Sequence, residues 1–351
     1  MPTTANPIRF PAEWETQSGV MLTWPHAQSD WRAKLGEIES VYIAMCKAIS
    51  AHETCIVLCL DEAHKNHIAE LLRAHGVSLD HCRLIICPTN DTWCRDYGPI
   101  TTLVDNKPLL NNFIFDAWGG KYQSLLDNAV TDCLQQQGLF ATDIMPREMV
   151  LEGGSIEPDG AGTLLTTSHC LLKRHPDKSK AEVEAHLQSM LGVKRMLWLD
   201  AGSLGGDDTD SHIDNLARFA NAETILYAAC TDKAHPDYAA LQEMQSQLKT
   251  FTRTDGSDYQ LLPLYLPDPV YDKGQALPAS YVNFLVINDA VLVPQFGQES
   301  DAAALVIFRQ TFPTREIIGI SSTALIKQFG GIHCATMHLP QGTLNQEPDN
   351  T

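Results

Sequence analysis

Hydrophobic residues along this chain alternate between short β-branched runs and stretches with helical spacing. The runs at residues 54–60 and 224–229 are short and apolar, which is typical of buried strands. Between such runs, apolar residues recur three and four positions apart, as in Val183, Leu187 and Leu191. This spacing places them on one face of a helix. The pattern therefore predicts a mixed α/β protein.

The predicted helices recur at nearly constant intervals of about 60 residues, which is a repeat-like signal. They are expected to begin near Asp61, Lys121, Ser179, Tyr238 and Asp301. Strand-like runs, such as residues 100–104 and 163–167, fill the intervals. About five modules, each with several strands and one helix, are predicted to form a ring or a layered body. A helix at residues 31–51, with Asp30 as its N-cap, fits this count poorly, and an ordinary α/β domain with chance spacing remains open.

The chain has 351 residues, and no linker or low-complexity run divides it, so we expect a single domain over residues 1–351. The hydrophobic fraction of 44% is sufficient for a full core. Lysine and arginine total 25, aspartate and glutamate total 43, and the formal net charge is −18. This charge disfavours nucleic acid and anionic membranes as partners and favours a small cationic ligand. An acidic surface without such a ligand would have the same charge.

The chain shows no targeting segment and no common metal-binding motif. Residues 1–6 show neither a basic nor an apolar segment, and no apolar run is long enough to span a membrane. The ten cysteines are irregularly spaced, unlike a secreted disulfide scaffold. A reduced, cytoplasmic protein is therefore expected. The chain lacks CxxC and HExxH motifs, so no metal site and no cofactor are expected.

Cys334 differs from the other cysteines, most of which lie in apolar runs. It follows the pair Gly330-Gly331, which permits close backbone approach and unusual dihedral angles. We expect it on a tight turn at the mouth of a cleft, with a positive neighbour or a helix N-terminus that lowers its pKa. A buried core cysteine is the alternative.

Acidic residues surround His212 in the segment from Asp207 to Asp214. In a strand, His212 and Asp214 would point to the same side. Histidine can protonate a leaving group and later activate water, because its pKa lies near neutrality. A surface ion pair is the alternative interpretation.

Two further segments suit the binding of a planar cation. Trp93 offers an aromatic face and Asp96 a carboxylate, although Arg95 could be the partner of Asp96 instead. Glu152 precedes two glycines and could orient His212 by accepting its second ring N–H. A β-bulge with a surface acid would also explain this second segment.

Together these stretches resemble the agmatine deiminase family, the bacterial peptidyl-arginine deiminase-like group of the guanidino-group-modifying superfamily. The matching segments are residues 11–15 (PAEWE), 23–25 (TWP), 93–99 (WCRDYGP), 117–122 (AWGGKY), 151–154 (LEGG), 209–219 (TDSHIDNLARF), 278–284 (PASYVNF) and 331–336 (GIHCAT). They span nearly the whole chain in the family's order. The resemblance implies a five-bladed α/β propeller (pentein-like) with pseudo-fivefold ββαβ modules and a central active site.

The resemblance also implies an activity, the hydrolysis of agmatine to N-carbamoylputrescine and ammonia without a cofactor. Cys334 matches the family's nucleophile, His212 its general acid/base and Glu152 the partner of that histidine. In such a mechanism, sulfur attacks the guanidinium carbon, ammonia leaves, and water hydrolyses the covalent amidino intermediate.

The remaining matches concern the substrate. Asp96 and Asp214 match the carboxylates that grip the guanidinium, Trp93 the aromatic residue beside it, and Asp208 a further acid that contacts substrate. The Asp207–Asp210 cluster and the scarcity of basic groups favour a substrate that ends in an amine.

The sequence departs from the family pattern at three places. Ser211 stands where a glycine is common, residues 337–340 (MHLP) where glutamines are common, and Gln17 where a histidine is common. These departures leave several alternatives open: deimination of arginine or peptidyl-arginine, amidino transfer, and a non-catalytic guanidine or polyamine binder. A papain-like hydrolase is disfavoured because His212 precedes Cys334. A homodimer is the default expectation for an oligomer.

Overall fold

The strands of this protein form five sheets of three or four strands and one separate two-stranded hairpin in the computed structural model, which describes residues 7–345. Each of the five sheets contains an antiparallel pair followed by a parallel pair. Parallel neighbours need a crossover connection, and here a helical segment supplies it. The predicted mixed α/β class is confirmed.

The first sheet joins the two ends of the described chain. Its spatial order is β19 (Thr336–Pro340), β2 (Gln17–Thr23), β3 (Thr54–Cys59) and β4 (Cys82–Ile86). Its helices are η1 (Asp30–Lys34), α1 (Leu35–Ser50) and α2 (Glu62–Ala74). The expected N-cap was wrong, because the Ser29 side chain, not that of Asp30, accepts the hydrogen bond from the Trp31 N–H.

The second sheet lies next along the chain. It consists of β1 (Ile8–Arg9), β5 (Ile100–Val104), β6 (Lys107–Ile114) and β7 (Ile144–Val150). Helix α3 (Cys94–Tyr97) precedes it, and α4 (Ala117–Gly120), η2 (Asp127–Ala129) and α5 (Val130–Gln136) join β6 to β7. The helix predicted to begin near Lys121 therefore begins at Val130, because α4 ends at Gly120 with left-handed residues.

The other three sheets have three strands each. They are β8 (Ile156–Pro158), β9 (Thr163–Thr167) and β10 (Arg195–Leu199); β11 (Ala217–Asn221), β12 (Thr224–Ala229) and β13 (Gln260–Tyr265); and β16 (Leu285–Val286), β17 (Ala290–Gln295) and β18 (Glu316–Ser321). Their helices are α6 (Ser168–Arg174), α7 (Lys180–Leu191), α8 (Tyr238–Leu248), α9 (Ser300–Thr311) and α10 (Thr323–Ile326). Single turns η3 (Gly153–Ser155) and η4 (Ile213–Asn215) precede β8 and β11, and β14 (Val270–Asp272) pairs with β15 (Gln275–Leu277) in the hairpin.

Strand pairing corrects the helix count made from the sequence. Helix α1 joins the parallel strands β2 and β3, as α8 joins β12 and β13, so α1 is the regular module helix. Helix α2 and strand β4 extend the first sheet beyond that pattern. Hydrophobic spacing identifies a helix, but it does not reveal which strands the helix connects.

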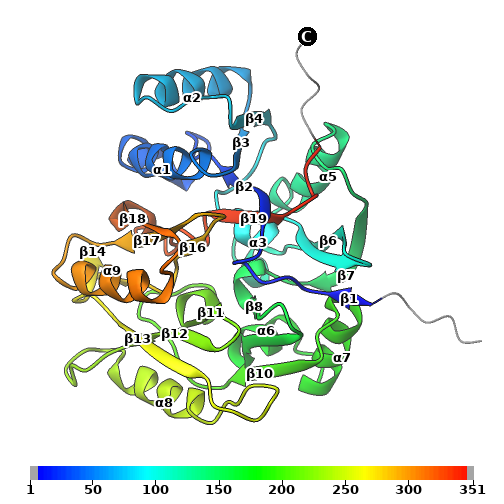
Figure 1. The fold of residues 1–351 in the computed structure, drawn as a ribbon. Helices are drawn as coiled ribbons and strands as arrows, with labels where there is room; N and C mark the ends of the chain where they lie inside the picture. Colours follow the sequence, from blue (N-terminus) through cyan, green and yellow to red (C-terminus); the bar gives the residue numbers. More distant parts are fainter. Residues whose placement is uncertain (1–6, 346–351) are drawn as a thin grey trace, which may run out of the picture.

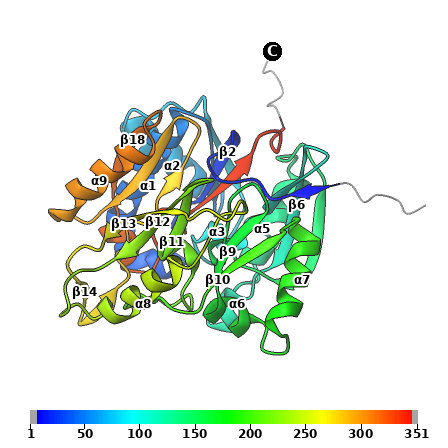
Figure 2. The same ribbon diagram turned by 60° about the horizontal axis from the view of Figure 1, so that its bottom comes forward.

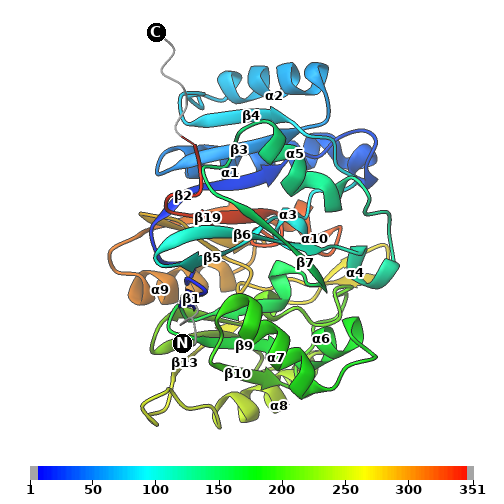
Figure 3. The same ribbon diagram turned by 90° about the vertical axis from the view of Figure 1, so that its right-hand side faces the viewer.

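The sheets surround the region where α3 and β19 lie (Figure 1). Helices α7, α8 and α9 lie at the periphery of the strands (Figure 2). The sheet of β19, β2, β3 and β4, with α2, lies at one end of the molecule, and the sheet of β11, β12 and β13, with α8, lies at the opposite end (Figure 3). Strand β12 is buried at every residue, as expected for a strand covered on both faces. Within residues 7–345, no helix combines the length and apolar character needed to cross a bilayer.

Candidate active site

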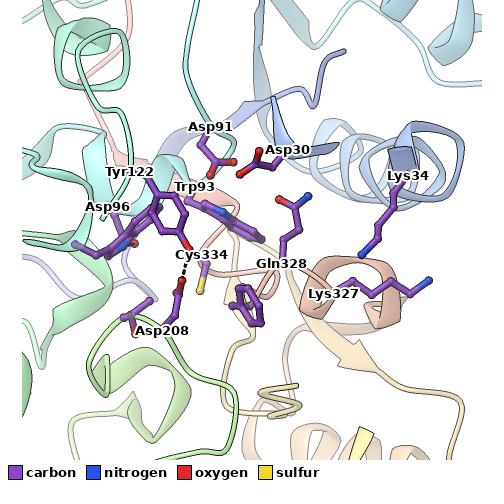
Figure 4. A pocket seen from close by; sticks show the side chains of 14 residues that line it. Asp30, Lys34, Asp91, Trp93, Asp96, Tyr122, Asp208, Lys327, Gln328 and Cys334 are labelled. Atoms are coloured by element: carbon purple, nitrogen blue, oxygen red, sulfur yellow. Dashed lines mark hydrogen bonds between the residues drawn. The ribbon is translucent and has the colours of Figure 1, made fainter. Parts of the chain in front are cut away.

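A cleft of about 230 Å³ contains four of the residues predicted to form a site. Trp93, Asp96, Asp208 and Cys334 line it together (Figure 4). Trp93 and Asp96 lie at helix α3, Asp208 lies in the loop before η4, and Cys334 lies in the turn before β19. Connections between different sheets therefore bring these distant segments together.

His212 and Asp214 lie beside this cleft, but not in a strand as predicted. Asp214 belongs to the single turn η4, and His212 immediately precedes it. Their side chains nevertheless converge. A Cβ built on Gly154 would lie 2.7 Å from His212 Nδ1, 2.9 Å from Asp96 Oδ1 and 3.0 Å from Asp214 Oδ2. Three polar atoms therefore surround one glycine, where any larger residue would collide with them.

Cys334 is deeper than expected, because it is only 3% exposed. Asn283 Nδ2 donates to its sulfur at 3.1 Å, and the sulfur lies 3.5 Å from Asp214 Oδ2. Burial, and then the negative charges of Asp214 and Asp96, raise the pKa of Cys334 well above its usual value. The expected pKa-lowering environment was therefore wrong, because these surroundings favour the thiol over the thiolate. A cation bound between the carboxylates would oppose their effect on the sulfur.

The glycine pair before Cys334 permits close packing, as predicted. A Cβ on Gly330 would lie 2.2 Å from the Trp93 ring, and a Cβ on Gly331 would lie 2.3 Å from Asn283 Oδ1. Neither glycine has a positive φ, so space rather than an unusual dihedral angle requires glycine here.

Glu152 contacts His212, which confirms the contact predicted from the sequence. His212 Nε2 lies 3.0 Å from Glu152 Oε2, and Arg174 Nε donates to Glu152 Oε1 at 2.6 Å. Burial favours a higher pKa for Glu152, but His212 and Arg174 outweigh it and lower that pKa. Glu152 is therefore ionised and accepts the Nε2 proton of His212.

The second ring nitrogen of His212 has no hydrogen-bond partner within residues 7–345. It lies 3.7 Å from Asp96 Oδ1. Burial lowers the pKa of His212, but the charge of Asp96 and contacts with Cys170 and Glu152 raise that pKa well above its usual value. A protonated Nδ1 thus faces the same region as Asp96.

Asp96 is held by two neutral donors. The Gly154 N–H donates to Oδ1 and Trp118 Nε1 to Oδ2, each at 2.9 Å. Burial raises the pKa of Asp96 to about 6. Arg95 is not its partner, because that guanidinium contacts Glu13 and His338 instead. The alternative of a structural Arg95–Asp96 pair is therefore wrong.

Asp214 is held differently. Its Oδ2 lies 2.9 Å from His333 Nδ1, and its Oδ1 has no partner within residues 7–345. Burial acts to raise the pKa of Asp214, but the hydrogen bond and charge of His333 lower it overall. Two differently supported carboxylates, one sulfur and one imidazole therefore meet, which is the set needed to bind and attack a planar cation.

The carboxylates of the acidic cluster before His212 differ in their surroundings. Asp208 lines the cleft and accepts from the Tyr122 hydroxyl at 2.8 Å, but Asp210 pairs with Arg174 at 2.7 Å. Asp207 accepts from the N–H groups of Thr209 and Ser211, so it stabilises its own loop. Asp208 is thus the member of the cluster that is available to a ligand.

Sequence reasoning did not assign a role to several contacting residues. They are Glu13, Trp118, Arg174, Asn283 and His333. All except Arg174 lie in segments matching the agmatine deiminases, and that position was the available signal. Arg174 lies in no such segment and was not identifiable.

One group of three metal-ligating side chains lies together in the described part of the chain. It consists of Glu152, Cys170 and His212, all buried. Glu152 already accepts from His212 and Arg174, and the Cys170 sulfur lies 3.6 Å from its Oε2. A metal ion would have to displace these contacts. All ten cysteines of the chain are unpaired.

Known proteins match this chain over nearly its full length. The agmatine deiminase of Medicago truncatula is 32% identical over 96% of this chain and 97% of its own length. A C. jejuni agmatine deiminase with one cysteine changed to serine, solved with substrate bound, is 33% identical, with a TM-score of 0.90 over 97% and 99% of the two chains.

A Porphyromonas gingivalis protein, provisionally named an arginine deiminase, is 41% identical, with a TM-score of 0.89 over 96% of this chain and all of that one. The family model for Porphyromonas-type peptidyl-arginine deiminases matches residues 9–340. The chain therefore belongs to the Porphyromonas-type peptidyl-arginine deiminase family and is a hydrolase that acts on carbon–nitrogen bonds of amidines.

Proposed function

We propose that this protein hydrolyses the guanidino group of a small cationic substrate, first of all agmatine, to a urea and ammonia. The observation that carries the proposal is the convergence of Cys334, His212 and two carboxylates on one cleft. His212 Nδ1, Asp96 Oδ1 and Asp214 Oδ2 all lie close to the Cα of Gly154, and the sulfur lies 3.5 Å from Asp214. A non-catalytic binder would not need a buried sulfur at that point.

Binding precedes the chemistry. The guanidinium lies between Asp96 and Asp214, with the Trp93 ring in the cleft wall beside it. Charge-assisted hydrogen bonds from a planar cation to two carboxylates define both position and orientation. The bound charge also offsets the repulsion that keeps the Cys334 thiol protonated.

Cys334 then attacks the guanidinium carbon and forms a carbon–sulfur bond. His212 Nδ1 protonates the departing nitrogen, the carbon–nitrogen bond breaks, and ammonia leaves. The thiol proton is lost to solvent as the carbon–sulfur bond forms, so His212 is left neutral and a cationic amidino thioether remains on Cys334. Glu152, ionised beside Arg174, holds the imidazole in the required orientation.

Water completes the reaction. Neutral His212 takes a proton from water, whose oxygen attacks the amidino carbon. The carbon–sulfur bond breaks, which releases N-carbamoylputrescine from an agmatine substrate and restores Cys334. Two steps with moderate barriers replace one difficult step.

The cleft mouth favours a substrate that ends in an amine. Its two lysines are already paired, Lys34 with Asp272 at 3.4 Å and Lys327 with Glu37. Asp30 also lines the cleft and has no ion-pair partner within residues 7–345. The available charge is therefore negative, which suits the amine of agmatine better than the carboxylate of arginine.

Arginine is the second candidate. The 41% identity to the P. gingivalis protein provisionally named an arginine deiminase favours it. Lys34 and Lys327 would then exchange their present partners for a carboxylate.

Product analysis by mass spectrometry tests the proposal. Agmatine, arginine and an arginyl peptide are incubated separately with wild-type protein and with Cys334→Ala. We expect a gain of about one mass unit with ammonia release on agmatine, absent in the variant. Conversion of arginine instead would preserve the mechanism and change the substrate. No conversion of any compound by folded protein would reject the activity.

We also infer that the five sheets are five blades of one propeller domain, described here over residues 7–345. The repeated order of an antiparallel and then a parallel strand pair supports this inference. A cytoplasmic location and a homodimer stay predictions.

A further inference from the structure

His333 directly precedes Cys334, yet its ring lies between two acids on the other side of Asp214 from the unpartnered Oδ1. Its Nδ1 lies 2.9 Å from Asp214 Oδ2, and its Nε2 lies 2.8 Å from Glu13 Oε2. All three side chains are buried. The proposed reaction assigns no task to His333 or to Glu13.

Glu13 is surrounded by donors. Its Oε1 accepts from Arg218 Nη2 and from the Val286 N–H, each at 2.8 Å, and its Oε2 accepts from Arg95 Nη2 at 3.2 Å. Burial acts to raise the pKa of Glu13, but these charges lower it well below its usual value. Because Glu13 is ionised, the proton between it and His333 resides on Nε2.

The other ring nitrogen of His333 faces Asp214. One proton is shared between Nδ1 and Asp214 Oδ2, so the two groups titrate as a pair. With Oδ2 occupied, Oδ1 is the oxygen left to a ligand, and it has no partner within residues 7–345. A guanidinium at Oδ1 stabilises the ionised carboxylate and therefore favours the proton on Nδ1.

We propose that His333, held by Glu13, is a positioning residue that presents Asp214 to the guanidinium as an oriented carboxylate. This inference rests on the proposed function. His333 does not contact the substrate. It acts through Asp214, whose carboxylate it orients.

Several charged groups bear on this pair. Those acting on Asp214 and His333 are Glu13, Arg95, Asp96, His212, Arg218, Cys334 and His338. Burial, Arg218 and Arg95 lower the pKa of His333, while Glu13 and Asp214 oppose that change. Removal of the His333 proton donor leaves Asp214 beside Asp96 in a buried site, which raises the pKa of Asp214.

The test compares three variants with wild-type protein. His333→Ala removes both contacts, His333→Asn retains a neutral donor near Nδ1, and His338→Gln is the matched control. His338 is a partly exposed neighbour of the same cluster, where it accepts from Arg95 at 2.8 Å, and desolvation lowers its pKa to about 3. It has no hydrogen bond to Asp214.

We expect kcat/KM of His333→Ala to fall about 10- to 100-fold, mainly through KM, because a charge-assisted hydrogen bond is lost. His333→Asn should recover much of this loss at pH 8. Its acid limb should still lie at higher pH than in wild type, because the amide supplies orientation without charge. His338→Gln should remain within about twofold of wild type, as a change that leaves the binding groups in place.

An acid limb that does not move in His333→Asn would overturn the inference, and this holds even where His333→Ala fails to fold. Binding separates this inference from the proposed function. Agmatine affinity is measured by calorimetry in Cys334→Ala with and without His333→Asn, at pH 6 and pH 8. A larger loss at pH 6 supports the role of His333 even if wild-type protein shows no turnover. An equal loss at both pH values contradicts it.

Discussion

Two buried histidines next to the cleft each contact a glutamate, but only one of them has a free ring nitrogen. His212 meets Glu152 through Nε2, and its Nδ1 has no hydrogen bond to any residue in the described part of the chain. His333 uses both nitrogens, one for Glu13 and one for Asp214. A histidine with a free nitrogen can transfer a proton to a ligand, whereas one with both nitrogens bonded can only hold its neighbours.

The charge of each glutamate is balanced by buried arginine. Glu152 is balanced by Arg174, and Glu13 by Arg95 and Arg218. Both pairs are buried, so removal of either acid would leave a buried arginine uncompensated. The same local motif therefore serves two purposes, and the number of free nitrogens distinguishes them.

The largest expected effect is at His212. We predict that His212→Asn lowers kcat by roughly 10²- to 10⁴-fold with little change in KM, because acid–base transfer is lost while the carboxylates remain. His333→Asn serves as the comparison and should mainly change KM. Steady-state kinetics on agmatine measures both. A kcat loss of equal size at His333 would break the proposed distinction.

Replacing each glutamate should move opposite limbs of the pH profile. Glu152→Gln removes a group that raises the pKa of His212. Because activity needs protonated His212, the fall of activity on the alkaline side should then begin at a lower pH than in wild type. Glu13→Gln should instead move the acid limb up, because the charge of Glu13 favours protonated His333, and less protonated His333 lowers the pKa of Asp214 less. We expect roughly 10- to 100-fold losses at pH 8 for Glu152→Gln.

The profile of kcat/KM against pH measures these limbs, and thermal unfolding tests the fold of each variant. Movement of the same limb in both variants would contradict the division of roles between the two glutamates.

The two binding carboxylates offer a third comparison. Burial raises the pKa of Asp96 to about 6, whereas the pKa of Asp214 is lowered. In the free enzyme, ionised Asp96 is present above pH 6 and disappears as pH falls. We therefore expect kcat/KM to decrease about tenfold per pH unit below pH 6. A profile that stays level down to pH 4 would show that Asp96 ionisation is not required.

The smallest effect concerns the backbone before each histidine. Gly331 and Gly330 lie two and three residues before His333. Asp210 and Ser211 directly precede His212, with φ values of 68° and 67°. Ser211→Gly should relieve left-handed strain and raise the free energy of unfolding by about 0.5 to 1 kcal/mol, the strain being partly offset by greater unfolded-state freedom. Thermal and denaturant unfolding measure it. Ala201 lies in the same connection between β10 and η4 but has no positive φ, so Ala201→Gly provides a control and should not stabilise the protein.

Much of the fold was predictable from local pattern. Strands β5, β9 and β12 have the predicted boundaries, since short apolar runs indicate buried strands. The region around Trp118 was predicted poorly. Trp118 has a left-handed φ of 59°, and α4 is therefore short. Tryptophan has no preference for this conformation, so the sequence does not predict it.

The candidate site was predictable where motifs carried it and not elsewhere. Cys334, His212, Glu152, Asp96 and Asp214 were all named from the sequence, and the structure brings them together. The surroundings of the thiol were not predicted: the sequence suggested a neighbour that lowers its pKa, whereas Asp214 and Asp96, far away along the chain, raise that pKa.

The sequence by itself determined the α/β class, most strands and the chemical identity of the groups at the cleft. These properties depend on residues within one short window, where hydrophobic period and motif can be recognised. Tertiary structure alone decided which histidine retains a free nitrogen. Glu13 and His333 are 320 positions apart, and Asp214 and His333 are 119 apart. Burial and hydrogen bonding depend on distances in space, which local pattern does not encode, so the different tasks of His212 and His333 appear only in the folded chain.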